Sequence, residues 1–353
     1  MARLSNVKRI VTAALFVCAA SAALFECAAS AALFECAASA QLPRIGYINF
    51  YGLRTLKEDQ ILAAARVGTG DTVPASRIDL EDRIIALPEV MDAHVQSVCC
   101  EGDHTTLFIG IRERGESDLE FHATPSGTAA LPEELMARYR KYTGELLRAE
   151  VKGKADAPDP VIRRDQEYFR TYAAGHTLKL RTELHSGADA EQRAAAAMVI
   201  GYSVNKRTAV DDLIFALLDP DEGVRANALR ALADIAVVAR KQPALGIRIP
   251  PATIVDLLNS VVLSDRVEAN KALVVLTEKP NAAALDRMRE RALPALAEMA
   301  RWHTPSYAQP PFLLLGRLAG LKEVEINDHW EKDDREPVIQ QALDTAPKKP
   351  GLQ

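Results

Sequence analysis

The chain has 353 residues, of which 48% are hydrophobic and 26% are charged, and its formal net charge at pH 7 is −5. A composition of this kind is typical of a folded globular protein, and the length favours two domains. The negative net charge, together with the lack of basic residues interleaved with aromatic ones, argues against nucleic acid and anionic lipid as partners.

Residues 1–40 have the pattern of a secretory signal. Basic residues precede an apolar run, Ile10 to Phe25, and a nine-residue unit repeats in tandem. The copies occupy residues 13–21, 22–30 and 31–39. We interpret them as a replication slip within the signal. Each copy ends in an Ala-x-Ala-like site, and we favour cleavage after Ala40. The alternative is an uncleaved anchor, in which Glu26 and Glu35 would be costly near a bilayer centre. The sequence therefore predicts an exported protein, periplasmic or associated with the cell envelope.

The stretch from Gln41 to Arg114 combines strand and helix patterns. An apolar run is followed by two helical stripes and then by two alternating runs. These segments are Ile45–Gly52, Lys57–Val67, Ser76–Leu87, His94–Cys99 and Leu107–Arg112. The spacing of their hydrophobic residues predicts strands for the first and the last two, and helices for the two between them. The sequence thus predicts a small β-α-α-β-β module of the α+β class, with His104 in the turn between the last two strands.

This order of elements resembles a POTRA domain, the polypeptide-transport-associated module. The residues that carry the resemblance are Ile48-x-Phe50-x-Gly52, Ile61-Leu62, Gly68-x-Gly70-Asp71, Leu87-Pro-Glu-Val90, Ala93-x-Val95 and Leu107-x-Ile109-x-Ile111-Arg-Glu-Arg114. One departure is Leu53, where the family often has Asn. The resemblance implies that the second strand lies at the sheet edge and binds an extended peptide by strand addition. The implied edge consists of Ala93, His94, Val95, Gln96, Ser97, Val98, Cys99 and Cys100. The alternative is that a downstream segment of the chain covers it.

Two of the five cysteines, Cys99 and Cys100, lie outside the predicted signal. Neighbouring residues of a strand point to opposite faces, so we expect one buried thiol and one half-exposed thiol. The alternative in an oxidising compartment is an intermolecular disulfide or metal capture. No further cysteine supports a metal site, and the sequence predicts neither a metal nor another cofactor.

Residues 115–160 connect this module to the second half of the chain. Gly115–Ala130 shows no periodicity and predicts a loop, whereas Leu131–Glu150 has the apolar stripe of a helix. Residues 152–160 have the composition of a linker. At the other end of the chain, residues 346–353 contain two prolines and predict a mobile tail.

Residues 161–345 predict an all-α domain of recurring amphipathic helices. Similar segments begin at Ala190, Asp221 and Asp265, at spacings of about 32 and 43 residues that suit paired-helix solenoids. Further helices are expected at residues 210–218, 254–263, 292–300 and 312–321. The run Asp219-Pro220-Asp221-x-x-Val224-Arg225 resembles the turn and second helix of a HEAT repeat, which implies structural roles for Asp219, Pro220 and Arg225. We expect Arg225 to reach back to an acidic group in the neighbouring turn, such as Asp212 or Asp219.

The sequence contains no convincing catalytic pattern. None of the seven histidines has the spacing of a zinc hydrolase motif. Gly201-Tyr-Ser203-Val-Asn205 resembles a nucleophile elbow, but it lacks the final glycine and is expected inside a helix. The run Asp328–Glu336 is rich in charge and predicts a solvated surface. HEAT-like repeats are also similar to those of bilin lyases, which leaves a lyase-type enzyme as an alternative. No chromophore-handling residue can be carried over.

The sequence therefore predicts a non-enzymatic, exported protein-binding or scaffold protein. Its expected partner is a polypeptide of the cell envelope, which can be an outer-membrane barrel protein, and neither nucleic acid nor a small-molecule substrate is expected. The alternative is a structural spacer that binds no specific client, because a solenoid can serve either purpose.

Overall fold

The computed structural model describes residues 44–101, 104–116, 119–151 and 160–347. The predicted signal, residues 152–159 of the predicted linker and residues 348–353 of the predicted tail lie outside the described residues. Beyond Pro43, the described residues belong to one compact unit.

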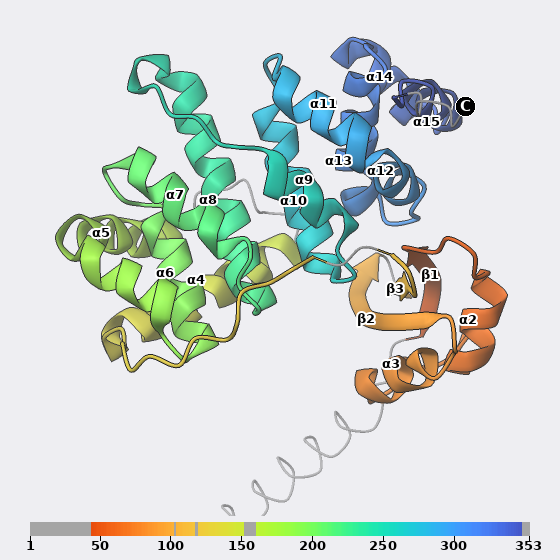
Figure 1. Cartoon of the computed structure of the whole chain (residues 1–353), viewed down its shortest axis with the longest axis horizontal. Helices are drawn as coiled ribbons and strands as arrows, with labels where there is room; N and C mark the ends of the chain where they lie inside the picture. The colour runs from red at the N-terminus through yellow and green to blue at the C-terminus, as the bar shows by residue number, and fades with distance from the viewer. Residues whose placement is uncertain (1–43, 102–103, 117–118, 152–159, 348–353) are drawn as a thin grey trace, which may run out of the picture. The chain divides into compact units, whose positions relative to one another are not determined.

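The predicted β-α-α-β-β order is confirmed in the first part of this unit. Its elements are β1 (Ile45–Tyr51), α2 (Glu58–Ala65), α3 (Arg77–Ile85), β2 (Val90–Glu101) and β3 (His104–Glu113). Figure 1 shows the three strands with α2 and α3 packed beside them. In the sheet β3 is central, parallel to β1 and antiparallel to β2. The prediction that His104 lies in a turn is wrong, because His104 pairs with Glu101 and begins β3.

Local chemistry explains where these elements begin and end. The Ser76 hydroxyl accepts a hydrogen bond from the Asp79 backbone N–H and caps α3. Gly52 follows β1 with φ of 81°, a conformation that glycine adopts readily, and a Cβ atom there would overlap the carbonyl oxygen of Ile111. The chain therefore turns sharply after β1 and enters α2.

Both faces of the sheet are buried. Side chains that alternate along the strands, such as Val95 and Ile109, pack with Ile61 and Ile84 of α2 and α3 in a small core. On the opposite face Tyr51 and Phe108 belong to a larger core that extends through the helices downstream. A sheet between two cores leaves only its edges for a partner.

The second part of the unit is helical, as predicted, and Figure 1 follows it from α4 to α15. The helices are α4 (Glu133–Val151), α5 (Pro160–Ser186), α6 (Ala190–Ile200), α7 (Lys206–Ala216), α8 (Glu222–Lys241), α9 (Ala252–Asp256), α10 (Leu263–Leu276), α11 (Ala282–Arg291), α12 (Leu293–Ala300), α13 (Pro305–Leu318), α14 (Glu323–Glu331) and α15 (Glu336–Leu343). Two 3₁₀ turns, Pro243–Leu245 and Leu257–Asn259, complete the set. Helices α6, α8 and α10 pack in succession, and α5, α7 and α9 each pack against the helix that follows. The arrangement is a repeat solenoid.

Two local predictions in the helical part are wrong. The helix expected at residues 254–263 is interrupted, because α9 ends at Asp256 and a 3₁₀ turn follows. Gly201–Asn205 forms the turn between α6 and α7 rather than part of a helix. The charged run Asp328–Glu336 has no buried residue and is mostly exposed, as predicted.

Candidate functional site

The two edges of the sheet differ in how the chain covers them. At β1, the Ile45 N–H donates to the carbonyl of Asp71 over 2.9 Å and the Ile45 carbonyl accepts from the Gly70 N–H over 2.7 Å. Farther along β1, the Trp302 indole N–H donates to the Phe50 carbonyl over 3.3 Å. The β1 edge is thus engaged by two other segments. The opposite edge is formed by β2.

The structure places the predicted edge residues within β2, with alternating environments. Ala93 and Val95 are buried in the small core, whereas His94, Gln96 and Val98 are half-buried on the other face. Burial lowers the pKa of His94. Ser97 and Cys99 are exposed. The Cys100 side chain lies outside the described part of the chain.

The prediction of a free thiol at Cys99 is wrong, because Cys99 is disulfide-bonded. The other four cysteines of the sequence have no described side chain.

One backbone donor of the β2 edge is already engaged by a side chain. The Val95 N–H donates to the Glu81 carboxylate of α3 over 2.7 Å. Because successive N–H groups of a strand point in opposite directions, the outward donors near this point are those of Ala93, Val95 and Ser97, and those of Gln96 and Val98 face β3. Glu81 was not predicted from the sequence. The hydrophobic spacing of α3 shows which residues face the core, but it does not show that an acidic residue accepts a hydrogen bond from the edge of a strand.

Exposed apolar side chains lie on α3 and at the start of β2. Ile78 is 63% exposed, Met91 is 51% exposed and Ile85 is 38% exposed. Helix α3 packs against β2.

The acidic partner expected for Arg225 is wrong. Arg225 pairs with Asp265 of the next repeat, with Nε and Nη2 each 2.8 Å from a carboxylate oxygen. Its Nη1 donates to the carbonyls of Asp219 and Pro220 in the preceding turn. The Asp219 carboxylate is occupied by Arg193, over 2.8 and 2.9 Å. The arginine therefore reaches forward along the solenoid, and each pair joins neighbouring repeats.

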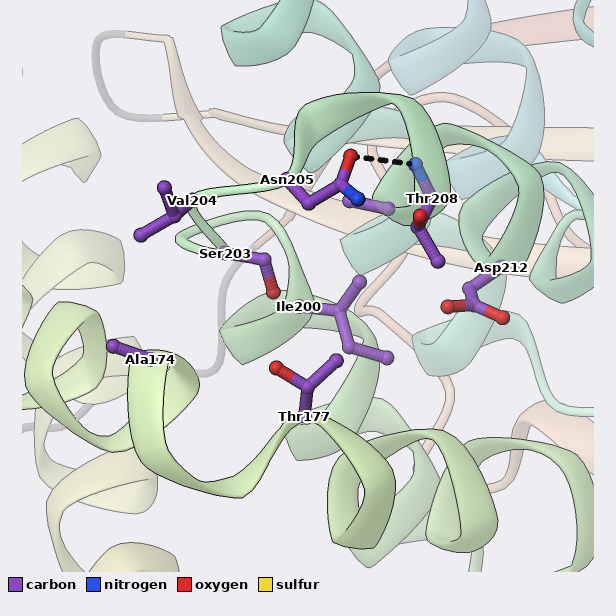
Figure 2. Close-up of a pocket in the computed structure, with 9 residues that line it drawn as sticks. Ala174, Thr177, Ile200, Ser203, Val204, Asn205, Thr208 and Asp212 are labelled. Carbon is purple, nitrogen blue, oxygen red and sulfur yellow. Dashed lines mark hydrogen bonds between the residues drawn. The ribbon is translucent and has the colours of Figure 1, made fainter.

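A small pocket lies between α5 and α7. Its volume is about 270 Å³, and its lining includes Thr177, Ile200, Ser203 and Asp212. Figure 2 shows the hydroxyl group of Ser203 turned toward Ile200, whereas the Thr177 hydroxyl donates to the Ala173 carbonyl of its own helix over 3.0 Å. Ser203 is 5% exposed, and its hydroxyl has no hydrogen-bond partner among the described residues.

The pocket does not assemble a nucleophile with its base. Asp212 accepts hydrogen bonds from Arg181 over 2.9 Å and from His185 over 3.0 Å, which resembles half of a catalytic triad. Activation of a serine requires a hydrogen bond to the base, and the Ser203 hydroxyl makes none with the described residues. In the same described ranges, no group of three or more His, Cys, Asp or Glu side chains is arranged to hold a metal ion.

Comparison with known proteins identifies the repeat. The family model for HEAT repeats matches residues 177–249, which span α6, α7 and α8. No curated protein matches the chain. Within the described residues, no helix has the length and apolar character needed to cross a membrane.

Comparison with solved structures finds designed repeat proteins. A designed armadillo repeat protein in complex with the peptide (KR)4 is 16% identical, with a TM-score of 0.33, over 61% of this chain and all of that chain. An engineered protein solved by the Northeast Structural Genomics Consortium is 17% identical, with a TM-score of 0.33, over 60% of this chain and 96% of that one. Computationally designed armadillo repeat proteins for modular peptide recognition are 17% identical with a TM-score of 0.32, over 60% of this chain and 100% of that one.

Proposed function

We propose that the chain is a non-enzymatic scaffold of the cell envelope that binds an extended segment of a polypeptide partner along the edge of β2. The POTRA-like order of elements supports strand addition as the binding mode, and the solenoid offers a second contact surface. The partner is an exported polypeptide, of which an outer-membrane barrel protein is one example.

The observation that carries this proposal is the difference between the two sheet edges. Contacts from Asp71, Gly70 and Trp302 engage β1, and both sheet faces are buried. A strand can therefore be added to the sheet on the side of β2 that faces away from β3. Main-chain hydrogen bonds at such an edge provide affinity.

The test is a proline at an outward-facing donor. Ser97→Pro removes a backbone N–H that points away from β3, and edge strands tolerate proline at such positions. We expect partner capture to fall by about tenfold or more, since at least one backbone hydrogen bond is lost. Proline at Gln96 or Val98 is unsuitable, because it would remove donors that face β3 and disrupt the sheet itself. The measurement is cross-linking and recovery of the partner from the envelope.

Ser97→Ala is the matched control, because it removes the hydroxyl and keeps the backbone donor. A partner recovered with the wild type and the alanine variant but lost with the proline variant supports strand addition. Equal recovery with all three excludes this edge as the binding site. If no partner is recovered reproducibly with the wild type, the spacer alternative is favoured.

A further inference from the structure

Glu81 closes part of the surface that the proposed partner would use. It lies on α3, its side chain is only 14% exposed, and its carboxylate accepts the outward N–H of Val95 over 2.7 Å. A partner strand that runs along β2 would place its own carbonyl oxygen at this N–H. The two acceptors compete for one donor, so the partner must either displace Glu81 or leave Val95 unpaired.

The contact has a physical purpose in the unbound protein. An edge strand with a row of open donors can pair with another copy of the chain and aggregate. A carboxylate accepts a stronger hydrogen bond than a neutral carbonyl does. The Glu81 carboxylate occupies the N–H of Val95, which lies between the outward N–H groups of Ala93 and Ser97. A second strand then finds no continuous row of free donors along β2.

We propose that Glu81 is an intramolecular latch on the β2 edge, and that the partner segment which displaces it carries a basic side chain at that position. This inference rests on the proposed function, because it names how the same edge is regulated and what kind of segment opens it.

The charge of the latch determines the chemistry of the segment. After displacement from the Val95 N–H, the Glu81 carboxylate still has its ion pair with Arg77. The Nε of Arg77 lies 3.4 Å from this carboxylate, and the Arg77 side chain is half-exposed. A mostly buried carboxylate that loses a backbone donor is destabilised unless another donor replaces it. A Lys or Arg on the incoming strand supplies that donor, whereas an acidic residue adds like-charge repulsion. The chain as a whole, with a net charge of −5, also favours a basic segment.

The first experiment tests the latch without any partner. Amide hydrogen exchange is measured at Val95 in the wild type, Glu81→Gln and Glu81→Ala. The glutamine side chain retains an oxygen acceptor, so Val95 should stay protected, whereas the alanine variant should exchange about tenfold faster or more, the factor expected for loss of one hydrogen bond. Amides of the central strand β3 are the internal control for folding. Equal exchange at Val95 in the wild type and Glu81→Ala would overturn the latch.

The second experiment tests the partner chemistry with two synthetic peptides, Thr-Val-Thr-Lys-Thr-Val-Thr and the same peptide with Glu in place of Lys, both with blocked ends. Binding is measured by NMR shifts of β2 amides. We expect the Lys peptide to bind the wild type about tenfold more tightly than the Glu peptide, and this preference to disappear in Glu81→Ala, which should also bind both peptides more tightly.

The outcomes separate the two proposals. If both peptides bind β2 equally in the wild type, strand addition stands and the basic-segment inference fails. If neither peptide shifts β2 amides in any variant, strand addition at this edge fails and the displacement of Glu81 fails with it. The exchange experiment still decides in that case whether Glu81 caps the edge.

Discussion

Glu183, near the end of α5, is fully buried, and neither of its carboxylate oxygens has a hydrogen-bond partner among the described residues. A Cβ atom at Gly187 would overlap this carboxyl group, which shows how tightly the turn after α5 closes over it. Burial raises the pKa of Glu183, the charge of Asp189 adds to the effect, and Arg193 and Lys179 oppose it. The neutral form of Glu183 is therefore favoured more in the folded protein than in the unfolded chain.

Glu183 makes the free energy of unfolding depend on pH, and the direction of this dependence follows from the raised pKa. A folded-state pKa above the unfolded value stabilises the protein fully below the unfolded pKa, and the contribution is lost as pH rises through the folded pKa. We expect the free energy of unfolding of the wild type to fall relative to that of Glu183→Gln as pH increases from about 4 toward neutrality, by on the order of 1 kcal/mol. Urea unfolding at several pH values measures the difference. Glu167→Gln, an exposed change on the same helix, is the control, and parallel curves for the wild type and Glu183→Gln would contradict the assignment.

At the scale of the element, the solenoid is held by arginine–aspartate pairs that join one repeat to the next. The Arg225 and Asp265 side chains are 2% and 0% exposed. Since Arg225 also donates to backbone carbonyls of the preceding turn, it fixes the ends of α7 and α8 relative to α10. A charge buried in this way is tolerated only while its partner is present.

Removal of one member should therefore cost more than removal of both. Asp265→Asn leaves the Arg225 guanidinium buried without its carboxylate, and we expect the free energy of unfolding to fall by about 3–5 kcal/mol. Arg225→Met combined with Asp265→Leu should cost clearly less than the sum of the single changes. Urea unfolding of the wild type, Arg225→Met, Asp265→Leu and the double variant tests this double-mutant cycle, and Asp265→Asn is measured beside them. Glu191→Gln, which breaks an exposed pair with Arg140, is the control and should leave the midpoint unchanged; additive losses would disprove the coupling.

Hydrophobic periodicity was enough to predict the elements but not their partners. The β-α-α-β-β order and the helical repeats follow from local spacing, whereas the edge position of β2 was implied only by the resemblance to a POTRA domain. The partner of Arg225 was missed because the true one, Asp265, lies 40 residues away, beyond the neighbouring turn that local reasoning considers. Glu81 was missed for a related reason, since its role depends on which strand N–H groups point outward after the sheet has formed.

At the scale of the whole described unit, the sheet and the helices share one core. The ring of Trp302 lies 5.0 Å from that of Phe108 and 5.6 Å from that of Tyr51. The Tyr51 hydroxyl donates to the Val261 carbonyl over 2.9 Å, and Arg266 lies over the Tyr51 ring at 4.6 Å. The sequence predicted a boundary between a strand-containing module and a helical one, yet these contacts make their folding interdependent.

We therefore expect the wild type to unfold in one cooperative transition, and Trp302→Ala to weaken that coupling. Loss of a buried tryptophan should lower the free energy of unfolding by about 3–5 kcal/mol. Because the lost contacts join the sheet to the helices, the variant should also show separate transitions for residues near β3 and for those near α8. Calorimetry together with hydrogen exchange of the two regions measures both effects.

The second tryptophan of the chain provides the control. Trp330 packs against Phe312 within the helical part, so Trp330→Ala should lower stability while the transition remains single. Two transitions in the wild type, or one unaltered transition in Trp302→Ala, would show that the shared core does not couple the parts. A coupled core has a consequence for binding, because a strand added to β2 then stabilises the solenoid as well as the sheet, and partner capture should raise the unfolding temperature of both.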